Sequence, residues 1–252
     1  MGSYAIPSRR RRLLLRRLST VLLVAGGLIL LDAALTLLWQ EPLTALQTTL
    51  RQDSLRGDLR RLEAAGPTRI EAAALAGLNT DRRRIAFLAR SLQRRTAAGD
   101  AVGRIAIPRI GANFVVVKGS APADLRKGPG TYDQAGLPGV PGTTAIAGHR
   151  TTYLAPFRHI DQLRPGDPIT IEMPYATFTY RVEATRIVAA DALWILRRVR
   201  YDRLVLSACH PLFSAAQRIV VFARLAKVLP LRGAQGGQGL DRRSGSLTPA
   251  QS

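Results

Sequence analysis

Residues 204–225 read LVLSACHPLFSAAQRIVVFARL, and this stretch decides the fold class. Two runs of Leu, Val, Ile and Phe, at 204–206 and 219–225, flank a short segment that contains proline and serine. β-Branched and aromatic residues favour extended backbone, whereas the segment between the runs suits a loop. The stretch therefore predicts two neighbouring antiparallel strands.

Similar runs recur upstream at regular intervals. They occupy residues 104–107, 114–117, 143–147, 169–171 and 178–188, with Gly, Pro and Asp clusters between them, as at 127–130 and 164–167. Many short strands separated by turn residues indicate an all-β barrel or sandwich rather than alternating strands and helices. We expect this β domain to cover residues 104–230.

Residues 40–103 have a different, helical pattern. Leu46, Leu50, Leu55 and Leu59 recur at helical spacing, a Gly-Pro pair at 66–67 ends that helix, and a second helix is expected over residues 79–96. Neither helix has a broad apolar face. The segment therefore predicts a helical stalk that carries the β domain, with coiled or surface-lying helices as the alternative.

The N-terminal region has the composition of a membrane anchor. Residues 18–39 are mostly apolar and end in Trp39, and six arginines lie within the basic flank at residues 1–17. A run of this length spans a hydrocarbon core of roughly 30 Å, and basic flanks stay cytoplasmic. A single-pass helix with an extracytoplasmic β domain is expected. A cleaved signal peptide is the alternative, because Asp32 interrupts the run.

The formal net charge of +20 does not by itself indicate a nucleic-acid partner. Many of the arginines flank the apolar run, and no basic stripe is interleaved with aromatic residues. An anionic cell wall or lipid surface is a better match for this charge. The tail at residues 231–252 is rich in Gly, Gln, Ser and Arg and is expected to be disordered.

Cys209 is the only cysteine, so it forms no intramolecular disulfide and no structural zinc site by itself. It lies where one predicted strand ends, and Arg218 lies where the next begins. An arginine beside a cysteine favours the reactive thiolate, and a guanidinium also stabilises the oxyanion formed during attack on a carbonyl. These two residues are candidates for a nucleophile and its oxyanion donor.

Acyl transfer from a thiol also needs an acid and base for the amines that leave and enter. The chain has three histidines: His149, His159 and His210. His149 ends a predicted strand and is our candidate. His210 directly follows Cys209, so its side chain should leave an extended strand on the opposite face, and His159 is expected in a solvated turn.

These motifs, taken together, resemble those of sortases, and in particular class E, in their order and spacing. The resemblance covers about residues 104–228 and rests on the stretches IPRI at 107–110, GPGTY at 128–132, AGHR at 147–150, LRPGD at 163–167 and LSACHP at 206–211, together with Arg218. It implies an eight-stranded β-barrel. The carboxylate cluster that binds calcium in some class A sortases has no evident counterpart in this sequence, so no metal is expected, and no cofactor is expected either.

The resemblance also implies a function. A sortase is a membrane-anchored cysteine transpeptidase that cleaves a C-terminal Leu-Pro/Ala-x-Thr-Gly signal after Thr and transfers the protein to an amine of the peptidoglycan precursor. Cys209, His149 and Arg218 match its catalytic positions. Tyr132, Ser207 and Ala208 match the signal site, with Tyr132 linked to Ala in the signal. Ala208 departs from the family, which usually has Thr before the nucleophile.

Two other functions fit the same residues. A membrane-tethered module that binds sorting signals without turnover would agree with Ala208. A cysteine hydrolase would share the first half of the reaction and pass the acyl group to water.

Overall fold

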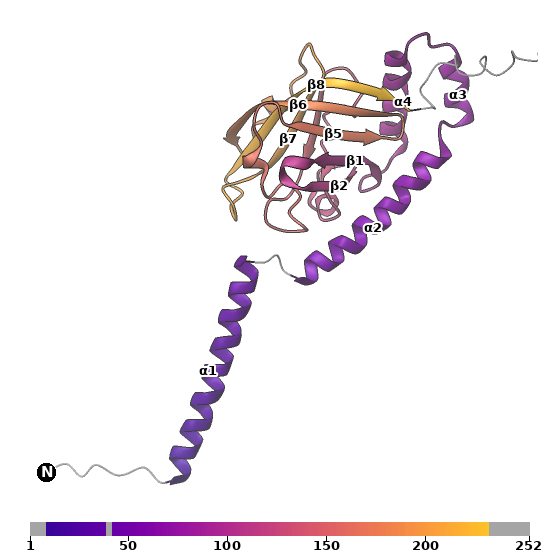
Figure 1. The fold of residues 1–252 in the computed structure, drawn as a ribbon. Coiled ribbons are helices and arrows are strands. Elements are labelled where there is room, and N and C mark those ends of the chain that lie inside the picture. The colour runs from indigo at the N-terminus through magenta and orange to yellow at the C-terminus, as the bar shows by residue number, and fades with distance from the viewer. Residues whose placement is uncertain (1–8, 39–41, 232–252) are drawn as a thin grey trace, which may run out of the picture.

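The computed structural model describes residues 9–38 and 42–231, with side chains described for 16–32 and 46–231. Eight strands form a closed barrel in the order β1-β2-β3-β4-β7-β8-β6-β5 (Figure 1). The strands are β1 Ala101–Ile107, β2 Ala112–Val117, β3 Gly130–Thr131, β4 Thr143–Ala147, β5 Pro168–Met173, β6 Ala176–Ala189, β7 Arg203–His210 and β8 Gln217–Pro230. The predicted all-β barrel is confirmed, and each of the runs singled out in the sequence lies within a strand.

The barrel is mainly antiparallel, and two of its strand pairs are parallel. β2 pairs parallel with β3, and β4 pairs parallel with β7. Because β4 and β7 run in the same direction, their carboxyl ends lie at the same end of the barrel. β8 is antiparallel to β7, so its first residues lie at that end as well.

Strand sequences alternate between the barrel interior and the outside. In β5, Ile169, Ile171 and Met173 are buried while the residues between them are partly exposed. The facing strand β6 buries Phe178 and Tyr180 in the same core. Because side chains of a strand point alternately to opposite faces, this pattern fixes the register that closes the barrel.

The helices before the barrel pack against it. They are α1 Arg9–Leu38, α2 Pro42–Ala65, α3 Arg69–Ala76 and α4 Asp81–Arg95. Ile85, Leu88 and Leu92 of α4 join the main barrel core, and Leu59 of α2 packs in a second cluster with residues of β1 and β2. The helices over residues 42–95 are therefore the surface-lying helices of the alternative interpretation, and not a detached stalk.

A buried glutamine joins α2 to the barrel by main-chain hydrogen bonds. Gln52 accepts from the Val115 amide at 2.8 Å and donates to the carbonyls of Val115 and Lys127, at 3.2 and 2.7 Å. One side chain thus satisfies both main-chain groups of Val115 on β2, which would be costly to leave unpaired in the interior.

Three short elements were not predicted from the sequence: strand β3, which has only two residues, helix α3, which follows the Gly-Pro pair at 66–67, and helix α5 Pro122–Leu125. α3 begins with a capping box in which Thr68 accepts from the Glu71 amide and Glu71 accepts from the Thr68 amide. This arrangement satisfies the free amides at the helix start.

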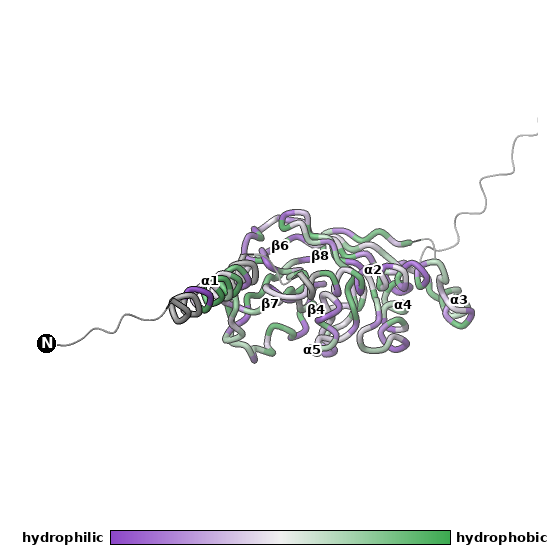
Figure 2. Tube along the Cα trace, turned by 90° about the horizontal axis from the view of Figure 1, so that it is seen from below, coloured by the Kyte–Doolittle hydropathy of each residue, from purple (hydrophilic) through white to green (hydrophobic). Residues whose placement is uncertain are grey.

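Helix α1 extends away from the barrel (Figure 1), and most of its described part is coloured as hydrophobic in Figure 2. Across the described residues, no helix combines the length and apolar character that a membrane span requires. The expected span over residues 18–39 is thus not shown here, and Trp39 lies outside the described residues. The first eight residues of the basic flank and residues 232–252 of the tail lie outside them too.

Candidate active site

The pairing of β7 with β8 places Cys209 beside Arg218. The two residues are direct partners in the antiparallel register, and the loop at 211–216 joins their strands. Both side chains are half-buried. The Nη1 atom of Arg218 donates to the carbonyls of Ala215 and Gln217, each at 3.0 Å, and so holds the start of β8. The structure thus makes the two residues neighbours across the strand pair, and their catalytic roles stay a prediction.

The parallel pair β4–β7 brings His149 to the same end of the barrel. Ala147 on β4 is the partner of Ser207 on β7, and the Gly148 amide extends the pairing by donating to the Ser207 carbonyl at 3.0 Å. His149 lies two residues after Ala147, and Cys209 lies two residues after Ser207, so both residues lie just beyond this pair. Cys209 and Arg218 therefore lie on the adjacent strands β7 and β8, and His149 lies two residues beyond the end of β4, the other neighbour of β7.

Gly148 sets the path of the chain into His149. A β-carbon at this position would lie 2.5 Å from Cδ2 of Phe157, whose ring is fully buried. Any side chain here would have to displace an aromatic ring of the core, which close packing resists. Only glycine lets the main chain pass this close to Phe157.

His149 lies in a site that disfavours its charged form. Burial and, second, the positive charge of Arg126 lower the pKa of His149 below its ordinary value of 6.5. Its Nε2 atom is buried and has no hydrogen-bond partner among the described residues. The ring of Tyr153 lies 5.0 Å from the imidazole, centroid to centroid. A neutral imidazole with an unpaired nitrogen is chemically able to accept a proton.

The other two histidines lie in different surroundings. His159 is exposed, and its Nδ1 is 3.3 Å from Nε2 of Gln162. His210 lies 3.3 Å, through Nδ1, from Nη1 of Arg150. The structure thus agrees with the expectation of a solvated His159 and gives His210 a separate partner.

Tyr132, Ser207 and Ala208 were expected to line the signal site. The Tyr132 hydroxyl lies 2.7 Å from Oγ of Ser207, and the Tyr132 amide donates to the Ala145 carbonyl. Ser207 and Ala208 are only 1% and 3% exposed, and Ala208 belongs to the main core. Of the three, Tyr132 alone offers a partly exposed surface. A substrate contact stays a prediction for all three.

One residue of this region escaped the sequence analysis. Arg150 directly follows His149, yet it is almost fully buried and contacts the strand that carries Cys209. Arg150 is part of the AGHR stretch at 147–150, but nothing in the sequence indicates a role for it. Arginines are seldom buried unless other groups pair with them. The partners of Arg150 lie in the 158–161 loop and at the end of β7, and no sequence pattern links these segments to Arg150.

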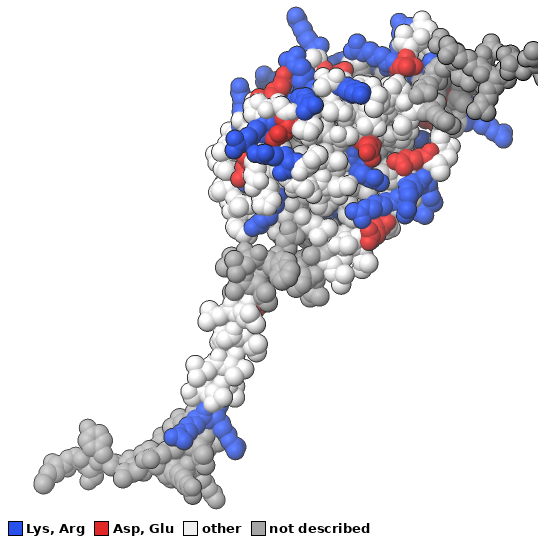
Figure 3. Space-filling model, in the orientation of Figure 1, with Lys and Arg blue, Asp and Glu red and all other residues white. Residues whose placement is uncertain are grey.

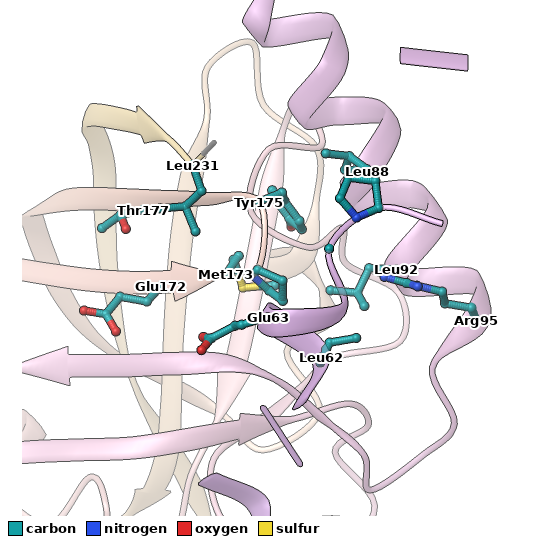
Figure 4. Close-up of a pocket in the computed structure, with 13 residues that line it drawn as sticks. Leu62, Glu63, Leu88, Leu92, Arg95, Glu172, Met173, Tyr175, Thr177 and Leu231 are labelled. Carbon is teal, nitrogen blue, oxygen red and sulfur yellow. The ribbon is translucent and has the colours of Figure 1, made fainter. Parts of the chain in front are cut away.

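A cavity of about 430 Å³ lies elsewhere in the molecule (Figure 4). It is formed between the end of α2, one face of α4 and the β5–β6 turn, with Leu92, Met173 and Tyr175 among its lining residues. None of the three candidate catalytic residues lines it. The cavity therefore lies at the interface between the helices α2 and α4 and the barrel.

Comparison with known proteins finds similarity to sortases. Residues 105–226 match the family model "Sortase domain". Sortase D of Bacillus subtilis is 32% identical over 130 residues, which are 50% of this chain and 64% of the relative. Sortase SrtE1 of Streptomyces coelicolor is 31% identical over 100 residues, 35% of this chain and 28% of the relative. The chain thus matches less than two thirds of either relative.

Solved structures show the same similarity. The SrtF sortase from Corynebacterium diphtheriae has a TM-score of 0.51 at 25% identity, covering 58% of this chain and 93% of that one. Sortase E from Streptomyces avermitilis has a TM-score of 0.50 at 26% identity, covering 56% and 97%. The barrel therefore has the sortase fold, and residues 105–226 of this chain are similar to sortase domains.

Proposed function

We propose that this protein is a sortase-type cysteine transpeptidase with Cys209 as nucleophile. The observation that carries the proposal is the register of three adjacent strands, which gathers Cys209, His149 and Arg218 at one end of the barrel. A thiol, an imidazole and a guanidinium are the groups that acyl transfer requires. Their convergence from distant parts of the sequence favours a reaction site over a structural role.

In the first half-reaction the Cys209 thiolate attacks the carbonyl carbon of the Thr–Gly bond in the sorting signal. A C–S bond forms while the C–N bond breaks, and the leaving amine takes a proton from His149. The products are a thioester on Cys209 and a free amino-terminal glycine peptide. Burial and the charge of Arg126 lower the pKa of His149, so the protonated imidazole gives up its proton to the leaving amine more readily than an ordinary histidine.

In the second half-reaction an acceptor amine attacks the thioester. His149 takes the proton from the attacking nitrogen, a new amide bond forms, and the C–S bond breaks to restore the thiolate. In the proposed reaction the acceptor is an amine of the peptidoglycan precursor, and the product is a secreted protein attached to the cell wall. The first half-reaction removes one proton from His149 and the second returns one, so the enzyme's protonation is unchanged after a full cycle.

Arg218 is proposed to stabilise the oxyanion of both tetrahedral intermediates. Its side chain belongs to the residue directly paired with Cys209, and the hydrogen bonds that the structure gives it use Nη1 alone. A guanidinium has five N–H donors in a planar arrangement, so donors remain for a substrate oxygen. Lysine would keep the charge and lose this geometry.

Tyr132 is proposed to contact the second residue of the signal and to favour Ala there, as in class E sortases. The hydrogen bond between its hydroxyl and Ser207 supports the proposal, because it fixes the ring next to the strand that ends in Cys209. Ser207 would act on the signal site indirectly, by holding the Tyr132 ring in place through this hydrogen bond. Ala208 would act by packing beneath the strand segment that carries Cys209.

The N-terminal segment is proposed to anchor the enzyme in the cell membrane, with the barrel on the extracytoplasmic side. The arginines that precede the apolar run at residues 18–39 support this orientation. Leu22, Leu23 and Leu30 of α1 are also largely exposed, with no barrel surface covering them. Figure 3 shows Lys and Arg spread over the visible barrel face, with acidic residues between them, and the net positive charge suits an anionic wall.

The decisive experiment supplies a Leu-Ala-x-Thr-Gly peptide with and without an amine acceptor and identifies the products by mass spectrometry. A ligated product supports the transpeptidase, a hydrolysed product alone supports a cysteine hydrolase, and binding without cleavage supports the non-catalytic module. Cys209→Ala should abolish turnover, and His149→Ala should reduce it by about 10²–10⁴-fold. His159→Ala is the matched control and should leave the rate within about twofold, since an exposed histidine contributes no catalytic proton transfer.

A further inference from the structure

Arg150 is the most deeply buried arginine among the described residues. It is 4% exposed, and it lies between β4 and the 3-10 turn at Ile160–Gln162. Removing a guanidinium from water is unfavourable unless the surrounding atoms supply partners. The partners that Arg150 has are therefore the reason that this conformation is stable.

The guanidinium joins two parts of the chain. On one side, Nη2 forms an ion pair with Oδ1 of Asp161 at 3.1 Å, and Nε donates to the Arg158 carbonyl at 3.4 Å. On the other side, Nη1 donates to the carbonyl oxygen of Cys209 at 3.5 Å and lies 3.3 Å from Nδ1 of His210. The planar group thus spans from the 158–161 loop to the end of β7.

The contact with His210 fixes the imidazole's proton. A guanidinium carries donors and no acceptor, so Nδ1 of His210 must be the acceptor in this hydrogen bond. The neutral ring then holds its proton on Nε2. Because the same Nη1 atom also reaches the Cys209 carbonyl, Arg150 contacts the groups on both sides of the peptide bond that follows the nucleophile.

We propose that Arg150 is a positioning residue for Cys209, which holds the end of β7 against the 158–161 loop and so fixes where the thiol meets its substrate. This inference rests on the proposed function, because the thiol is taken as the nucleophile. Asp161 is half-exposed and orients the guanidinium from the solvent side. A shift of the nucleophile by about 1 Å is enough to reduce a rate by about 10²-fold.

Two variants separate geometry from charge. Arg150→Lys keeps the positive charge and can reach only some of the partners, whereas Arg150→Gln removes the charge as well. Asp161→Asn removes the negative charge that pairs with the Arg150 guanidinium and keeps Arg150 itself. Arg164→Gln, which changes an exposed arginine of the neighbouring loop, is the matched control.

The readouts are kcat and KM for the signal peptide, ¹⁵N chemical shifts of the His210 ring, and amide hydrogen exchange at residues 209 and 210. Arg150→Lys should lower kcat by about 10- to 100-fold with KM nearly unchanged, because the binding surface remains and the nucleophile moves. In the same variant the ¹⁵N shifts of the His210 ring should change from those of the tautomer protonated at Nε2 alone to those of a mixture of tautomers. Exchange should accelerate by roughly 2- to 12-fold, the factor that one net hydrogen bond provides. Asp161→Asn should give the same changes in smaller size.

A wild-type kcat in Arg150→Lys, or the same loss in Arg164→Gln, overturns the proposal. An unchanged His210 tautomer in Arg150→Lys overturns it as well. If Arg150→Gln does not fold, the Lys and Asp161→Asn variants decide. The ring and exchange readouts need no substrate, so they still test the positioning role if the wild-type protein turns over no signal peptide, a result that would count against the proposed function alone.

Discussion

Replacing Leu59 by alanine should destabilise the barrel, although the residue lies outside it on α2. Leu59 is fully buried and packs against Ala101 of β1 and against Val115 and Val117 of β2. Truncating a leucine in such a site costs about 2–5 kcal/mol, which combines lost burial with the cavity left behind. For a domain of this size each kcal/mol shifts Tm by about 2–4 °C, so we expect a decrease of roughly 4–20 °C.

The assay is thermal unfolding of the full chain followed by circular dichroism. Leu50→Ala is the matched control, because Leu50 is on the same helix and 62% exposed, and an exposed substitution should change stability by about 0.5 kcal/mol or less. Equal shifts in the two variants would refute the packing argument and return α2 to the status of a detachable stalk. The same reasoning predicts that a protein starting at residue 42 is more stable than one starting at residue 100.

Three further predictions concern the site and its surroundings. The pKa of His149 should lie below 6.5 in an NMR titration, and Arg126→Gln should move the midpoint upward, since a repelling charge is removed; an unchanged midpoint would remove Arg126 as a cause. Tyr132→Phe should reduce the preference for Ala over Pro in the signal, and equal discrimination by both proteins would exclude the hydroxyl from recognition. Cell fractionation should find the full chain in the membrane, and a soluble mature chain beginning near residue 35 would instead indicate a cleaved signal.

Much of the barrel was predictable because each strand has its own local pattern. The alternation of Ile169, Ile171 and Met173 needs no knowledge of the rest of the chain. Strand β3 has two residues, and a segment this short carries no periodicity. It is a strand only because β2 and β4 pair with it, so the tertiary structure creates it.

The packing of the helices was harder to predict for a related reason. α4 presents Leu88 and Leu92 to the barrel, but the many arginines between its apolar positions give the impression of a solvated helix. Gln52 shows the same limit more clearly. Its buried position is explained by the main-chain groups of Val115, which lie 63 residues further along the chain.

The candidate site was predictable where neighbouring strands decide it. Cys209 and Arg218 follow from one strand pair and one short loop. His149 required a barrel in which β4 lies beside β7, and the family resemblance supplied what local pattern does not. Arg150 was not predictable, because its burial depends on Asp161 and on the end of β7 together.

The parallel pairing of β4 with β7 has a consequence for how such an enzyme can be altered. His149 lies two residues beyond β4, and Cys209 lies on β7, which main-chain hydrogen bonds join to β4. Residues 150–202 connect the two by way of β5 and β6. Residues 190–202, between β6 and β7, lie outside the barrel strands, so this segment can be exchanged or lengthened while the β4–β7 pairing stays in place. The 158–161 loop should be left intact in such redesigns, because Arg150 joins it to the end of β7.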